Sequence, residues 1–134
     1  MKSTQLILFF LFLLVLTACE KEPVSISPFD MLAGKKWYLE QRFVKSSSDS
    51  VRYSFIGLPT FWFRLKTDSS YMDSDGYIGR YLVEQSADTL LLNVTELNRG
   101  IAKSYRVNYL GFNYLIVEYN MNQNLTRLYF SSRL

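Results

Sequence analysis

The chain has 134 residues, no histidine, a single cysteine and a formal net charge of +3 at pH 7. A chain of this length can bury one hydrophobic core but not two. Without histidine or a second cysteine it lacks the commonest general base, the commonest metal ligand and any disulfide. The small net charge argues against nucleic-acid binding. We therefore predict one domain that is not an enzyme and has no metal, cofactor or nucleic-acid partner.

Residues 1–18 have the composition of a cleaved export signal. One cation, Lys2, precedes an unbroken apolar run from Leu6 to Leu16, and small or polar residues follow up to Cys19. The apolar run is shorter than the about 20 residues that a membrane-spanning helix needs, and a small-residue cleavage site follows it. The pattern predicts a signal peptide over residues 1–18.

The stretch Leu16-Thr17-Ala18-Cys19 resembles the lipobox of bacterial lipoproteins. In that family the cysteine sulfur receives a diacylglycerol, the signal is cut just before the cysteine, and the new amino terminus is acylated with a fatty acid such as palmitate. The resemblance implies a lipid on Cys19 and an anchor in the cell envelope, at the outer membrane, on either its periplasmic or its surface face. Several acyl chains make such attachment effectively permanent. The alternative is an ordinary cysteine beside a generic signal peptidase site.

Residues 19–29 are predicted to be the lipidated cysteine and a polar tether, with the folded domain over residues 30–134. Pro23 prevents a helix from starting at the anchor. Further on, Ser27, Pro28 and Asp30 form a helix-start pattern of a cap, a proline and an acid, and Gly34 ends it. This predicts one or two helical turns. The residues expected to share a face and close one end of the domain are Phe29 and Leu32 or Ala33.

After Gly34, apolar and polar residues alternate with the period of two that is typical of half-buried strands. Short turn clusters separate the runs, and short connections join antiparallel neighbours. The predicted strands are 37–43, 51–55, 61–66, 77–84, 90–94, 105–109, 115–119 and 125–129. They predict an all-β fold, an eight-stranded antiparallel up-and-down barrel with a short N-terminal helical turn, which has no open sheet edge. A flattened two-sheet sandwich is the alternative.

The order of these features resembles the lipocalin-like domains of bacterial outer-membrane lipoproteins over residues 30–134. The features are the start Leu32-Ala33-Gly34-Lys35-Lys36-Trp37, the Phe-rich strand 61–66, a hairpin from Tyr71 to Tyr81, and the pair Tyr105-x-Val107 and Leu115-x-Val117. Lipocalins carry Gly-x-Trp in the first strand, whereas two residues separate Gly34 from Trp37 here. The resemblance also implies that Trp37 packs near an arginine of the last strand, either Arg127 or Arg133.

The inward face of the predicted barrel is mostly aromatic and aliphatic. Such a lining suits a small hydrophobic ligand, with tyrosine hydroxyls as polar contacts. The residues predicted to line it are Trp37, Phe43, Tyr53, Phe61, Phe63, Tyr81, Tyr105, Tyr109, Tyr119 and Tyr129. The same rings could instead fill the barrel. In that case we expect a protein-interaction or inhibitor module with an envelope protein partner, bound through outward apolar residues such as Trp62, Ile78 and Leu82.

The carboxylates show no catalytic or metal-binding pattern. Glu40, Glu84 and Glu118 fall on the outward face of their strands, as in cross-strand surface pairs. Asp73-Ser74-Asp75-Gly76 resembles a fragment of a calcium loop, but it lacks the third acidic position and the distant glutamate. Asp-Gly between two strands predicts a hairpin turn instead.

Overall fold

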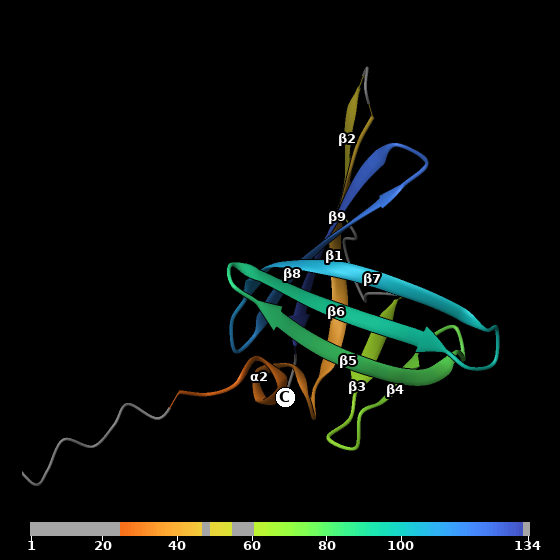
Figure 1. Cartoon of the computed structure of the whole chain (residues 1–134). Helices are drawn as coiled ribbons and strands as arrows, with labels where there is room; N and C mark the ends of the chain where they lie inside the picture. Colours follow the sequence, from red (N-terminus) through yellow and green to blue (C-terminus); the bar gives the residue numbers. More distant parts are fainter. Residues whose placement is uncertain (1–24, 47–48, 55–60, 133–134) are drawn as a thin grey trace, which may run out of the picture.

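The computed structural model describes residues 25–46, 49–54 and 61–132 (Figure 1). The predicted signal peptide and Cys19 lie outside these residues. The described part contains one short helix and one sheet. The helix is α2 (Pro28–Leu32), and the strands are, in chain order, β1 (Lys36–Lys45), β2 (Ser50–Ser54), β3 (Trp62–Leu65), β4 (Ser70–Asp73), β5 (Ile78–Ser86), β6 (Thr89–Glu96), β7 (Ile101–Leu110), β8 (Tyr114–Met121) and β9 (Asn124–Ser132). None of its helices is long and apolar enough to cross a membrane.

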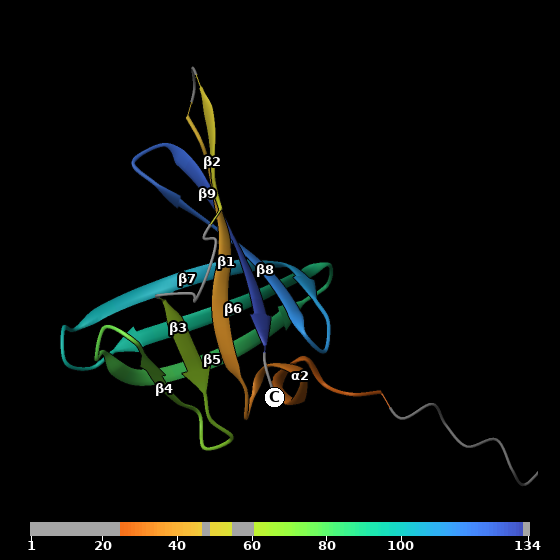
Figure 2. The same ribbon diagram turned by 180° about the vertical axis from the view of Figure 1, so that it is seen from behind.

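The sheet closes into a barrel because β1 has strand neighbours on both sides. The order of the barrel strands is β1-β3-β4-β5-β6-β7-β8-β9, and β9 pairs again with β1, antiparallel throughout (Figures 1 and 2). The predicted all-β, eight-stranded antiparallel barrel with a short helix at its start is therefore confirmed, and the alternative two-sheet sandwich is wrong.

The eight barrel strands differ in one member from those predicted. β2 and β3 lie one after the other along the same edge of β1, where Ser54 pairs with Gln41 and Trp62 pairs with Tyr38. Only β3 continues the barrel, through β4, while β2 projects with the end of β1 beyond the barrel rim (Figure 2). β4 belongs to the predicted hairpin from Tyr71 to Tyr81, but it was not counted among the eight strands because it is four residues long and begins and ends with polar side chains.

A β-bulge in β1 corrects the inward direction predicted for Phe43. The pairing with β9 shifts register between Leu39 and Gln41, so one extra residue stands in β1. An extra residue reverses the face to which all later side chains point. After the bulge Arg42 therefore lies on the inward side of β1, where its side chain borders the barrel interior and remains exposed to solvent. Phe43 lies on the outer face, where its ring is 5.9 Å from the guanidinium of Arg52.

A second bulge has the same effect in β7. The pairing with β8 shifts between Val107 and Tyr109, so that Val107 and Leu110 pack against the core while Tyr109 is 53% exposed. The inward direction predicted for Tyr129 is also wrong, since its neighbour Phe130 is the buried residue of β9. Phe130 has the opposite parity, which leaves Tyr129 on the outer face.

Helix α2 forms as its residues predict. Ser27 caps it, with the backbone N–H of Asp30 donating to Ser27 Oγ at 3.2 Å, and Pro28 occupies the first turn. Pro28 and Phe29, which we assigned to the tether, belong to this helix. Its carboxyl end turns at Gly34, whose φ of +77° lies in the left-handed region that glycine tolerates.

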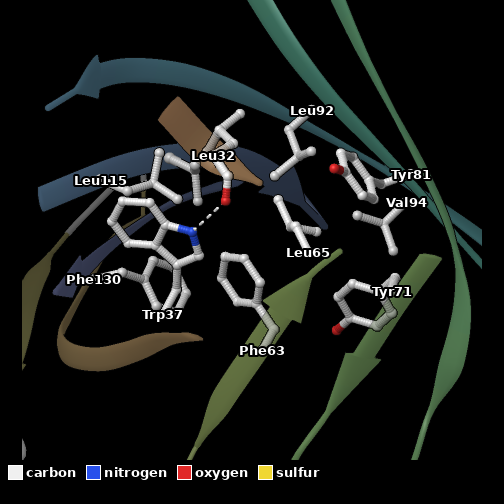
Figure 3. Close-up of a cluster of buried hydrophobic side chains, with 11 residues drawn as sticks. Leu32, Trp37, Phe63, Leu65, Tyr71, Tyr81, Leu92, Val94, Leu115 and Phe130 are labelled. Atoms are coloured by element: carbon white, nitrogen blue, oxygen red, sulfur yellow. Dashed lines mark hydrogen bonds between the residues drawn. The ribbon is translucent and has the colours of Figure 1, made fainter. Parts of the chain in front are cut away.

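The helix closes one end of the barrel. Leu32 is fully buried, and the ring of Phe29 stacks on Tyr81 with the centroids 5.7 Å apart. The indole N–H of the fully buried Trp37 donates to the carbonyl oxygen of Leu32 at 3.1 Å (Figure 3). This bond fixes α2 to β1 and satisfies a helix-end carbonyl that the core would otherwise leave without a partner.

The cation near Trp37 is not the predicted Arg127. Arg127 forms an ion pair with Glu118 on the outer wall, while Lys35 Nζ lies 5.6 Å from the centroid of the Trp37 ring. Arg133 lies outside the described residues.

Replacing Trp37 with alanine should lower the free energy of unfolding by about 3–5 kcal/mol, because a large buried ring is lost and the Leu32 carbonyl loses its donor. Urea unfolding followed by circular dichroism measures this change. Trp62→Ala is the matched control, since Trp62 is only half-buried and its ring contacts Lys36 at 3.8 Å. Equal losses in the two variants would contradict the structural role of Trp37.

Candidate functional site

A cavity of about 370 Å³ lies inside the barrel, toward the end opposite to α2. Its volume falls within the range of about 300–1,000 Å³ found for small-molecule sites. Aromatic rings form much of its wall: Phe61, Phe63, Tyr71, Tyr105, Tyr119 and Phe130. The aliphatic part consists of Leu39, Leu92, Val94, Val117 and Leu128, and the charged residues are Arg42 and Asp75. The fully buried Leu32, Leu65 and Leu115 do not reach the cavity, so the barrel is packed at one end and hollow at the other.

The structure brings together only part of the lining that the sequence predicted. The predicted residues that border the cavity are Phe61, Phe63, Tyr105 and Tyr119. Trp37 and Tyr81 lie in the packed core, where the hydroxyl of Tyr81 donates to the carbonyl oxygen of Lys66 at 2.7 Å. Four other predicted residues belong neither to the cavity wall nor to the packed core: Phe43, Tyr53, Tyr109 and Tyr129.

Tyr53 faces the same side as the barrel interior, but beyond the rim. The hairpin of β1 and β2 has a surface groove of about 510 Å³ on this side, bordered by Val44, Val51 and Tyr53. Tyr53 is 51% exposed there because β2 lies outside the closed barrel. Arg42 borders both the groove and the cavity, so its side chain lies between the two.

Two tyrosines of the cavity, Tyr71 and Tyr105, are neutral hydrogen-bonding groups. Tyr105 and Tyr119 occupy adjacent strands, and their rings meet edge to face with centroids 5.5 Å apart. Burial, together with the neighbouring Tyr119, raises the pKa of Tyr105 above its usual range. Burial and a hydrogen bond to Asp73 likewise raise the pKa of Tyr71. Both phenols therefore keep their protons at ordinary pH and cannot act as bases.

Arg42 was not identified as a site residue from the sequence. Its alternation with Phe43 placed it outside, and only the bulge turns it toward the cavity. Among the described residues no carboxylate forms an ion pair with it, in contrast to Arg99 and Arg127. Arg42 is thus a cation at the cavity that is available to a polar or anionic group of a ligand.

The buried acid Glu96 is fully compensated. Its Oε2 accepts from Arg99 Nε at 2.7 Å and its Oε1 accepts from Lys103 Nζ at 2.6 Å. The Arg99 guanidinium also lies 3.7 Å from the centroid of the Tyr77 ring. Burial alone would raise the pKa of Glu96, but the hydrogen bonds from Lys103 and Arg99 outweigh it, and the pKa is lowered. A carboxylate held ionised in this way stabilises the fold and is a poor proton donor.

Asp73 stabilises the β4–β5 turn. Its Oδ2 accepts from the Tyr71 hydroxyl at 2.7 Å, and its Oδ1 accepts from the backbone N–H groups of Asp75 and Tyr77 at 3.0 Å each. Gly76 follows with φ +83°, as expected for an Asp-Gly turn. Within residues 25–46, 49–54 and 61–132, no three His, Cys, Asp or Glu side chains come together in a manner that could hold a metal ion.

Comparisons with protein-family models, with curated proteins and with solved structures give no match for this chain.

Lowering the pH should remove the contribution of Glu96 to stability. Its folded-state pKa lies below the unfolded value of about 4.3, so the stabilisation is complete above that pH and is lost as the pH falls through the folded-state pKa. Glu96→Gln should lower the free energy of unfolding at pH 7 by about 1–3 kcal/mol. The variant should also lose stability less steeply than the wild type below about pH 4.3.

Urea unfolding at a series of pH values measures both effects. Glu84→Gln is the control, because Glu84 accepts a hydrogen bond from Asn93 at an exposed position, and it should follow the wild-type pH profile. Parallel profiles for Glu96→Gln and the wild type would contradict the role of Glu96.

Proposed function

We propose that this protein is a lipoprotein of the cell envelope, anchored through Cys19, whose barrel binds a small hydrophobic ligand in the cavity opposite α2. The observation that carries the ligand-binding part is the cavity itself, about 370 Å³ lined mainly by aromatic and aliphatic side chains. A barrel filled by its own rings would have no such volume. The function is binding and not catalysis, since the polar groups at the cavity are neutral phenols, Arg42 and Asp75.

The lining also suggests the kind of ligand. An apolar body would lie against Phe63, Val94 and Val117 in the interior. A polar group would remain near Arg42, which also borders the hairpin groove. The ligand class supported best is therefore an apolar or aromatic molecule with one polar end.

Protein binding is the second candidate function. Ile78 and Leu82 on the outer face of β5 are 55% and 57% exposed, which favours a partner surface. However, Arg80 stands between them on the same face, and it interrupts the apolar patch. We therefore place binding in the cavity first.

Filling the cavity should abolish binding of a hydrophobic probe. Leu128→Trp adds a large ring to the cavity wall, and the affinity for the uncharged fluorophore N-phenyl-1-naphthylamine should fall about tenfold or more, equivalent to ~1.4 kcal/mol. Fluorescence titration of the chain from Glu20 onward, which retains all described elements, measures this affinity. Leu82→Trp, the same substitution on the outer wall, should bind the probe as the wild type does. Equal affinities in both variants, or no binding by the wild type together with no co-purified ligand in native mass spectrometry, would exclude the cavity as the site.

The anchor has its own test. Metabolic labelling with a fatty-acid probe should label the wild-type protein, and the label should disappear in Cys19→Ala, because the only sulfur that can receive the diacylglycerol is removed. Retention of the label in Cys19→Ala would mean that the lipobox interpretation is wrong.

A further inference from the structure

We propose that the connection between β7 and β8 contacts the surface of the lipid bilayer to which the protein is anchored. The contact is made by Tyr109, Phe112 and Tyr114, which we call the aromatic turn. This inference rests on the proposed anchor at Cys19 and is independent of ligand binding in the cavity.

The aromatic turn is the most exposed aromatic surface of the described residues. The exposed fractions are 53% for Tyr109, 62% for Phe112 and 64% for Tyr114, and only Tyr53 among the other rings is also more than half exposed. The Tyr109 ring folds over the turn, where a Cβ on Gly111 would lie 3.1 Å from it. A mainly apolar surface groove of about 330 Å³ lies beside Tyr109 and Tyr114 on the outer wall. The contact of three large rings with water at one turn has a free-energy cost, and a partner that covers the rings would remove this cost.

The turn lies at the end of the barrel from which the tether leaves. Lys35, which follows α2, donates from Nζ to the carbonyl oxygen of Phe112 at 2.7 Å. Figures 1 and 2 both place the β7–β8 connection beside α2, so the chain that leads into α2 arrives at the same end. From Cys19 to Ser25 the chain has six residues (25 − 19), which span at most about 22 Å when fully extended. A lipid on Cys19 therefore holds this end of the barrel, and not the open end, close to the membrane.

The chemistry of the turn fits a bilayer surface. Tyrosine and phenylalanine rings gain free energy at the boundary between headgroups and acyl chains, where the ring is apolar and the hydroxyl of tyrosine remains hydrated. Lys35 Nζ lies 5.4 Å from the centroid of the Phe112 ring, so a cation stands next to the apolar ring and can reach lipid phosphates. A protein partner would have to approach this end within the short distance that the tether leaves. With the turn on the bilayer, the cavity opens away from the membrane.

Tryptophan reporters in vesicles test the contact. The full chain is expressed and processed in bacteria, and the purified protein is reconstituted into vesicles of phosphatidylcholine and phosphatidylglycerol that contain lipids brominated near the top of the acyl chain. Phe112→Trp should be quenched by the brominated lipid several-fold more strongly than Leu97→Trp, and its emission should shift to shorter wavelength. Leu97 is the matched control because it is 61% exposed and follows β6 at the opposite end of the barrel. Tyr114→Trp provides a second reporter position.

The outcomes separate the contact from the anchor. The wild type, with Trp37 and Trp62, supplies the background signal, and flotation on a density gradient shows whether the protein is on the vesicles. Protein that floats but shows equal quenching at positions 112 and 97 overturns the membrane contact while leaving the anchor intact. Covering of the turn by another protein or a second copy would give that result. Protein that does not float, and is not labelled by a fatty-acid probe, overturns the anchor and with it the inference.

Discussion

The closure of the barrel depends on β1, because this strand pairs with β3 at one end of the strand order and with β9 at the other. Its first half pairs with β3 and its second half with β2, while β9 runs beside both halves. A closed sheet leaves no edge within the barrel, which protects it from pairing with other chains. The bulge between Leu39 and Gln41 lies where the partner on the other edge of β1 changes from β3 to β2. The same bulge places Arg42 on the inward side of β1, so it also supplies the cation at the edge of the cavity.

The two ends of the barrel differ in how tightly their side chains pack. At the closed end, Trp37 and Leu32 link the helix to the first strand, and the fully buried side chains concentrate there. At the other end the rings stand around a space that they do not fill. A small barrel that placed its cavity among its best-packed residues would lose the contacts that hold it together. Separating the two lets residues such as Leu39 and Leu128 remain half-buried at the cavity wall without much loss of stability.

The sequence predicted the fold well and the cavity lining only in part. Alternation in β5, β6 and β8 was sufficient to place Tyr81, Val94 and Val117 inside, because no extra residue stands in these strands. Alternation fails where a bulge resets the parity, and this explains the misplaced Phe43 and Tyr109. In β1 a signal was present, since the apolar Phe43 at an odd position is followed directly by the apolar Val44 at an even one. In β9 both parities are apolar, and only tertiary packing decides between them. β2 lies outside the barrel because β3 pairs with the first half of the same edge of β1 and continues the barrel, and no local pattern encodes this choice.

The distribution of charge at the cavity bears on the kind of ligand that we propose. Glu96 is buried next to the interior, but Arg99 and Lys103 neutralise it, so it neither attracts a cation nor provides a proton. Asp73 is equally engaged, by the Tyr71 hydroxyl and two backbone N–H groups. The charged groups of the wall are Arg42 and Asp75, and both are exposed to solvent. Arg42 has no ion-pair partner in the described part of the chain. A ligand that covered Arg42 would displace the water around it, so, for the ligand binding that we propose, we expect a hydrogen-bond acceptor or a negative charge at one end of the ligand to favour binding over a pure hydrocarbon.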